Sequence, residues 1–179
     1  MGREARLMHG PGPSETPGTC SPTWGDVIPV TDKMVYTLRA DRRRIWRNAR
    51  DLALAQWTAS GALEFLVLED RDPGRFTGEN LHALMEPDTL VLIRNAAGGG
   101  DSGGWFDGAE PNPIRGAVVI LSPWRPWWRA YWTKSLVAVI SHEVGHCLGF
   151  GHTSVGGIMG GASKPSEHEL DSVRSFYGG

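Results

Sequence analysis

The residues best suited to chemistry lie together in the stretch 142–152, which reads HEVGHCLGFGH. His142 and His146 are four residues apart, so on a helix their rings project from one face and can bind the same ion. Gly149 can take a left-handed conformation that ends the helix and turns the chain back, which brings His152 round as a third ligand. Three protein ligands leave one tetrahedral position open for water, which is the arrangement of a catalytic zinc site.

Glu143 follows the first of these histidines and is not needed to hold the metal. It is placed to accept a proton from a zinc-bound water, whose pKa zinc lowers to about 7. The resulting hydroxide can attack a peptide carbonyl, and Glu143 can then pass the proton to the leaving amine. The spacing therefore predicts Zn²⁺ as cofactor and Glu143 as general base. A buried histidine cluster and a zinc site that binds without cleaving remain as alternatives.

The fixed positions of this stretch, together with Met159 in GGIMG, resemble the H-E-x-x-H-x-x-G-x-x-H motif and Met-turn of the metzincin zinc peptidases. Thr153, the start VYTLR and the ending ELDSVRSFYG are similar to matrixin catalytic domains within that clan. The resemblance implies a zinc metalloendopeptidase that hydrolyses protein or peptide substrates, with Met159 as a hydrophobic floor under the metal. It also implies an extracellular location, although no signal peptide is readable in the sequence.

Two other functions stay open. One is a zinc amidase or peptidase acting on cell-wall peptides, anchored by the Trp-rich run 123–132, which reads PWRPWWRAYW. Core packing is the alternative explanation of that run. The other function is a non-catalytic zinc-binding interaction module. Glu143 argues against such a module, because a binding site needs no base.

The Gly-rich segment 96–112 is expected to be an irregular loop. It is loosely similar to the matrixin loop that holds structural zinc and calcium, but it contains no histidine. Asp101 and Asp107 are candidate ligands for a structural Ca²⁺, and the alternative is a plain surface loop. Cys20 is a candidate latency thiolate for the zinc, a candidate disulfide partner of Cys147, or a free thiol without such a role.

The elements that must position these residues follow from hydrophobic periodicity. Strands are expected over 34–39, 63–69, 89–94 and 116–122, and helices over 42–58, 133–148 and 167–176. The inward face of the first helix is expected to contain Ile45, Ala49, Leu52, Ala53, Gln56 and Trp57. Ser166 with Glu169 fits a capping box for the last helix. The fold class is α+β, or mixed α/β. The metzincin resemblance implies a twisted, mostly parallel sheet with an active-site helix and a C-terminal helix.

Length and composition limit the remaining possibilities. The 179 residues suit one catalytic domain over 24–179, preceded by a flexible Pro- and Gly-rich tail over 1–23. The net charge of −2 lacks the basic excess of a nucleic-acid binder, and the run DRRR at 41–44 is expected to be the solvated start of a helix. The sequence shows no apolar run long enough for a transmembrane segment, and two cysteines are too few for a disulfide framework. We expect a monomer.

Overall fold

The computed structural model describes residues 4–7, 27–34, 40–68, 89–94, 100–106, 114–121, 129–152 and 156–178. These residues form an α+β domain with one six-stranded sheet in the order β1-β5-β6-β4-β2-β3. The strands are β1 (Glu4–Leu7), β2 (Val27–Met34), β3 (Glu64–Val67), β4 (Leu90–Arg94), β5 (Gly100–Phe106) and β6 (Ile114–Leu121). The helices are α1 (Ala40–Thr58), α2 (Arg129–Cys147), the short 3₁₀ helix η2 (Ile158–Gly160) and α3 (Glu167–Tyr177).

The sheet combines parallel and antiparallel pairings. The consecutive pairs β3–β2, β2–β4 and β4–β6 are parallel, whereas β5 pairs antiparallel with β6 and with β1. The parallel neighbours β2 and β3 are joined through α1, because parallel strands need a crossover connection. The apolar strand expected over 116–122 is found as β6, and it lies inside the sheet between β4 and β5.

Of the first expected strand, over 34–39, only Met34 lies in the described part of the chain, where it ends strand β2; residues 35–39 lie outside that part. Strand β2 runs from Val27 to Met34, and residues 27–33 were not expected to form a strand. Pro29 hides this strand in the sequence, because proline cannot donate to a sheet ladder and normally argues against an interior strand. Here Leu68 N–H donates to the Val30 carbonyl, so the backbone of Val30 faces β3. Pro29 then faces β4, whose pairing with β2 begins only at Val30.

Two strands lie in segments whose sequence predicts no regular structure. Strand β5 falls within the Gly-rich segment 96–112, so the expectation of an irregular loop there is wrong for Gly100–Phe106. The sequence GDSGGWF lacks apolar alternation, and its pairing with β6 and β1 supplies the order that local propensity does not. Strand β1 falls within the segment 1–23 that was expected to be a tail. The domain boundary at residue 24 stays a prediction.

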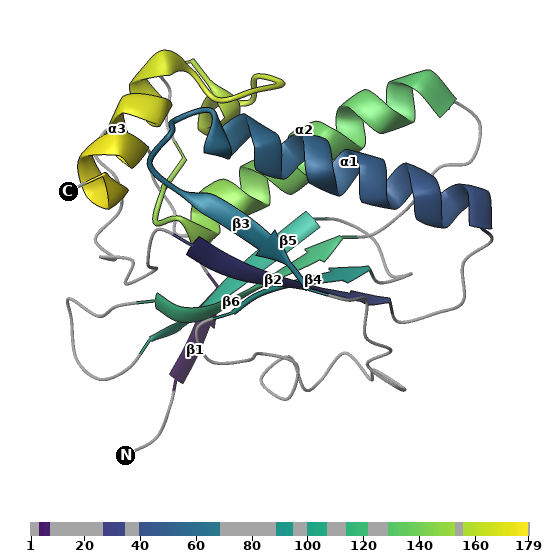
Figure 1. Cartoon of the computed structure of the whole chain (residues 1–179), viewed down its shortest axis with the longest axis horizontal. Coiled ribbons are helices and arrows are strands. Elements are labelled where there is room, and N and C mark those ends of the chain that lie inside the picture. The colour runs from purple at the N-terminus through teal and green to yellow at the C-terminus, as the bar shows by residue number, and fades with distance from the viewer. Residues whose placement is uncertain are drawn as a thin grey trace.

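Helices α1 and α2 lie beside each other on one face of the sheet (Figure 1). The inward face of α1 buries Trp46, Ala49, Ala53 and Trp57, which are three or four residues apart, and the neighbouring Leu54. Leu52, expected on this face, is 55% exposed, because the face is rotated toward Trp46 and Leu54.

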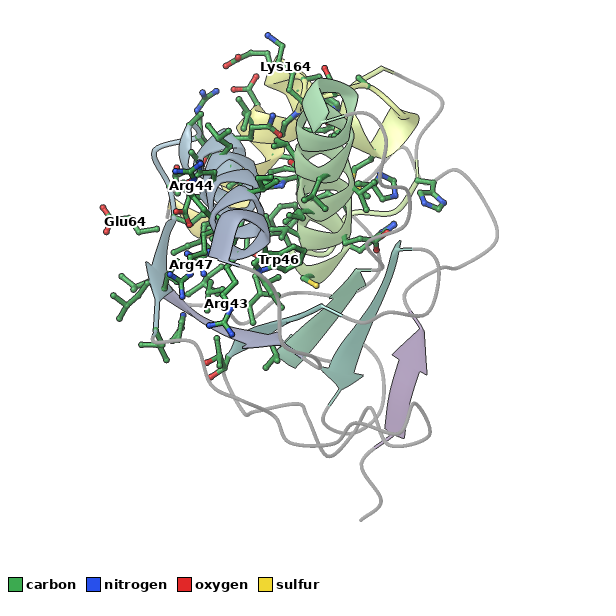
Figure 2. The ribbon with its side chains drawn as sticks, turned by 90° about the vertical axis from the view of Figure 1, so that its right-hand side faces the viewer. Arg43, Arg44, Trp46, Arg47, Glu64 and Lys164 are labelled. Atoms are coloured by element: carbon green, nitrogen blue, oxygen red, sulfur yellow. The ribbon has the colours of Figure 1, made fainter. Side chains whose placement is uncertain are left out.

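The outer face of α1 is basic. Arg43, Arg44 and Arg47 are exposed there, whereas Trp46 lies on the side of α1 that faces α2 (Figure 2). The expectation of a solvated helix start at the arginine run is therefore confirmed for Arg43 and Arg44.

Helix α3 begins as the sequence predicts. The Ser166 side chain accepts a hydrogen bond from Glu169 N–H, and the Glu169 side chain accepts from Ser166 N–H, so the capping box is confirmed. At its other end, the Tyr177 hydroxyl donates to the Leu148 carbonyl at 3.2 Å. Arg174 Nε donates to the Ser60 carbonyl at 3.0 Å. Helix α3 is therefore fastened to the ends of both long helices. Among the described helices, none is long and apolar enough to cross a membrane.

Candidate metal centre

The last two turns of α2 contain the first three residues of the predicted site. His142 is half-buried, Glu143 is 4% exposed and His146 is 1% exposed. The side chains of His142 and His146 share one face of the helix because they are four residues apart. Glu143 and Cys147 are also four residues apart, so their side chains lie close together on an adjacent face of the helix. The negative charge of Glu143 therefore disfavours ionisation of the Cys147 thiol. Burial, and secondarily the Glu143 carboxylate, raise the pKa of Cys147 well above its ordinary value. Cys147 is a buried core residue, as expected.

Gly149 ends the helix in the way its position in the motif predicts. Its φ is +99°, which favours glycine. The Gly149 N–H donates to the His146 carbonyl, and the Phe150 N–H donates to the Gly145 carbonyl, both at 3.0 Å. These two bonds are the Schellman pattern of a helix C-terminus. The chain then reverses, and His152 comes back to the face that presents His142 and His146.

The three imidazoles converge on one point. The Nε2 atom of His142 lies 3.1 Å from Nε2 of His146 and 3.1 Å from Nε2 of His152. The Nε2 atoms of His146 and His152 are 3.2 Å apart. Among the described residues, these three histidines are the one group of His, Cys, Asp or Glu side chains that could hold a metal ion. The structure therefore brings together all three predicted ligands.

Backbone carbonyls fix the orientation of two of the rings. His142 Nδ1 lies 3.0 Å from the Ile158 carbonyl oxygen, and His146 Nδ1 lies 2.8 Å from the Phe150 carbonyl oxygen. A carbonyl can only accept, so both Nδ1 atoms carry the proton. In the neutral rings, the two Nε2 atoms then present lone pairs toward each other. Two lone pairs cannot form a hydrogen bond, whereas a cation between them satisfies both.

The spacing of the donor atoms fits a zinc ion. Nitrogen ligands about 2.0–2.1 Å from zinc at tetrahedral angles lie about 3.3 Å from one another. The observed separations of 3.1–3.2 Å are close to that value. Three imidazole donors of this kind also suit other late first-row transition metals. The site can thus hold a metal ion through His142, His146 and His152.

Met159 lies beneath the helix that carries the histidines. It is in η2 and is 3% exposed. A Cβ atom built on Gly145 would lie 2.5 Å from the Met159 sulfur and 2.8 Å from the Trp57 ring. The sulfur is therefore packed against the backbone of α2 between the two helical histidines, and only glycine at 145 leaves room for it. The Trp57 indole N–H donates to the Ser141 carbonyl at 2.9 Å, which holds α1 against the same part of α2.

A buried carboxylate holds the turn that contains Met159. Glu169 is 4% exposed, and its Oε1 accepts from the Met159 N–H at 3.0 Å. Its Oε2 accepts from Ile158 N–H at 3.1 Å and from Ser166 N–H at 2.6 Å. Gly157, with φ +105°, permits this approach, because a Cβ there would lie 2.2 Å from Oε2. The sequence identifies Glu169 as a helix cap but carries no signal for its contact with the turn.

The other predicted site residues lie mostly outside the part of the chain that the structure describes. Asp101 lies in β5, where it pairs with Ile120, and its side chain is outside the described part of the structure. Asp107, Cys20 and residues 122–128 of the Trp-rich run lie outside the described residues, and residues 129–132 begin α2. The candidate calcium site and the latency thiolate remain predictions.

Comparison of the chain with models of known protein families and with curated proteins finds no match.

Proposed function

We propose that this chain is a zinc-dependent metalloendopeptidase of the metzincin type, similar to the matrixin catalytic domains. The convergence of the His142, His146 and His152 Nε2 atoms within 3.1–3.2 Å of one another supports the proposal most strongly. The order of the elements agrees with it, because an active-site helix is followed by a methionine turn and a C-terminal helix. Zn²⁺, when bound by the three histidines, acts as a Lewis acid that lowers the pKa of water and polarises a substrate carbonyl.

Glu143 supplies the proton transfers in this proposal. It lies one residue after the first ligand, and it is 4% exposed. A buried carboxylate interacts more strongly with a neighbouring cation than an exposed one does, because the local dielectric constant is lower. Glu143 accepts the proton of the attacking water and donates it to the amine that leaves when the peptide bond breaks. His142 and His146 contribute as neutral ligands whose Nδ1 protons are held by carbonyls.

The test compares the wild-type chain with Glu143→Ala for zinc content and casein cleavage. The variant should bind zinc stoichiometrically and lose activity by about 10²- to 10⁴-fold, the usual contribution of general acid–base catalysis. Glu64→Ala is the matched control, because Glu64 is an exposed carboxylate on β3 (Figure 2) and should change neither property. A chelator should abolish wild-type cleavage.

The outcome also separates the proposal from its alternatives. Stoichiometric zinc without cleavage of casein at any pH would count against an endopeptidase. Release of peptides from purified peptidoglycan in a parallel incubation would then favour the cell-wall amidase or peptidase. Equal activity of Glu143→Ala and wild type would refute the role of Glu143 as base.

A further inference from the structure

The contacts of Glu169 reach beyond the helix that it caps. Its carboxylate accepts four hydrogen bonds in a buried position, of which two come from the N–H and the hydroxyl of Ser166 at the start of α3. The other two come from the backbone N–H groups of Ile158 and Met159. A helix cap needs only the Ser166 contacts. The remaining pair connects α3 to the turn beneath the histidines.

One of these bonds leads directly to a metal ligand. The Met159 N–H and the Ile158 carbonyl belong to the same planar peptide group, in which resonance couples the nitrogen and the oxygen. Glu169 Oε1 accepts from that N–H at 3.0 Å, and the carbonyl oxygen accepts from His142 Nδ1 at 3.0 Å. The sequence of contacts is therefore carboxylate, peptide group, imidazole. Hydrogen bonds in such a series polarise one another and strengthen together.

We propose that Glu169 is a positioning residue for the metal ligand His142, acting through the Ile158–Met159 peptide group. This inference rests on the proposed zinc site. A carboxylate that accepts directly from a ligating histidine fixes the tautomer of the ring and raises its basicity. Here one peptide group stands between the carboxylate and the imidazole, and it transmits the charge through its own polarisation. Glu169 therefore both fixes the Ile158 carbonyl and makes it a stronger acceptor for the His142 proton.

His146, the second ligand on α2, is oriented differently from His142. His146 donates to the Phe150 carbonyl, and Phe150 is held by its N–H bond to Gly145 within the helix end. That support is local to α2, whereas the support of His142 comes from α3. Loss of the Glu169 carboxylate should thus weaken one ligand and leave the other in place.

The first experiment measures zinc affinity by competition with a chromophoric chelator. Glu169→Gln keeps the size of the side chain but removes its charge and one of its two acceptor oxygens. We expect zinc affinity to fall by about tenfold, the lower end of the range for partners of ligating histidines. Glu167→Gln is the matched control. It makes the same change at an exposed carboxylate in the first turn of α3, which contacts Arg174 and not the turn, so it should leave zinc affinity unchanged. Equal losses of zinc affinity in the two variants would overturn the proposal, since the effect would then follow the charge of α3 alone.

A second measurement uses the wild-type chain and does not depend on the folding of a variant. Zinc binding makes the His142 Nδ1 proton a better donor, which should strengthen the bond from Met159 N–H to Glu169. In an NMR titration with zinc, the Met159 amide proton should therefore move downfield. The Ile158 amide donates to the same carboxylate but belongs to the preceding peptide group, so it should move much less. Equal shifts, or no shift of the Met159 amide on saturation with zinc, would overturn the proposal.

The role of Glu169 and the proposed peptidase function can fail separately. Neither the zinc affinity nor the shift of the Met159 amide proton requires hydrolysis of a substrate. Unchanged zinc affinity in Glu169→Gln, with casein cleavage intact in the wild type, overturns the role of Glu169 alone. Reduced affinity in the variant, with no cleavage by the wild type, overturns the peptidase alone. Absence of saturable zinc binding by the wild type overturns both.

Discussion

Gly145, between the two helical histidines, should not tolerate even a methyl group. Alanine in a helix interior normally stabilises relative to glycine, by about 0.8–1.0 kcal/mol. In this protein the added Cβ would lie 2.5 Å from the Met159 sulfur and 2.8 Å from a Trp57 ring carbon. Comfortable contacts between such atoms are about 3.5–4.0 Å long, so the overlap is about 1 Å at two places. Both side chains are buried, at 3% and 0% exposure, and have little room to retreat.

Overpacking at Gly145→Ala lowers the free energy of unfolding by more than the gain in helix propensity raises it. Overpacking of a filled core costs about 1–3 kcal/mol, and two simultaneous overlaps favour the upper half of that range. Subtracting the gain in helix propensity leaves Gly145→Ala destabilised by about 1–2 kcal/mol. For a domain of this size, that corresponds to a decrease in Tm of about 2–8 °C.

The assay is urea or thermal unfolding in the presence of a chelator, so that zinc affinity does not enter the result. Gly156→Ala is the matched control, because a Cβ there meets nothing within 4 Å. The double variant Gly145→Ala/Met159→Ala should be less destabilised than the sum of the single changes, since removing the methionine side chain relieves one overlap. A Gly145→Ala protein as stable as wild type, or strict additivity in the cycle, would refute the packing argument.

Two further predictions concern the turn and the C-terminal helix. Gly157 and Gly161 both have positive φ, of +105° and +91°, but only a Cβ at Gly157 would meet the Glu169 carboxylate. Gly157→Ala should therefore lower the free energy of unfolding by clearly more than the roughly 1–2 kcal/mol expected for Gly161→Ala, and equal losses would contradict the contact. Burial raises the pKa of Tyr177 above its ordinary value of 10, so its stabilising contribution is complete below pH 10 and is lost as the pH rises further. Tyr177→Phe should lose about 1 kcal/mol at pH 7 with its bond to Leu148, and its stability should fall less steeply above pH 10 in pH-dependent denaturation, whereas an equally steep fall would be contrary evidence.

The parts of the site that the sequence predicts correctly are those fixed by short-range geometry. His142 and His146 share a helix face because of their spacing, and Gly149 ends that helix through its own backbone freedom. The capping box at Ser166 and Glu169 is equally local, and it is present. Each of these features depends on fewer than about ten consecutive residues, so no knowledge of distant partners is needed to recognise it.

The features that the sequence conceals depend on partners far along the chain. Strand β5 has the composition of a loop and owes its order to pairing with β6 and β1. Strand β2 contains Pro29, which is tolerated because pairing with β4 starts one residue later. Leu52 is exposed because the residues of α1 that pack into the core are those on the side of Trp46 and Trp57. In each case, tertiary contacts override local propensity.

In the histidine centre, one ligand is oriented by residues close to it in the sequence and another by residues far along the chain. His146 is held by a carbonyl that the end of its own helix supplies, so this ligand should be oriented whenever α2 is formed. His142 is held by the Ile158 carbonyl, whose peptide group is fixed by Glu169 on α3. Because Tyr177 also fastens α3 to the end of α2, we expect the docking of α3 and the orientation of His142 to be coupled. Metal binding that requires both ligands must therefore stabilise the docked C-terminal helix as well as the site, since any ligand that binds only the ordered state shifts the equilibrium toward it.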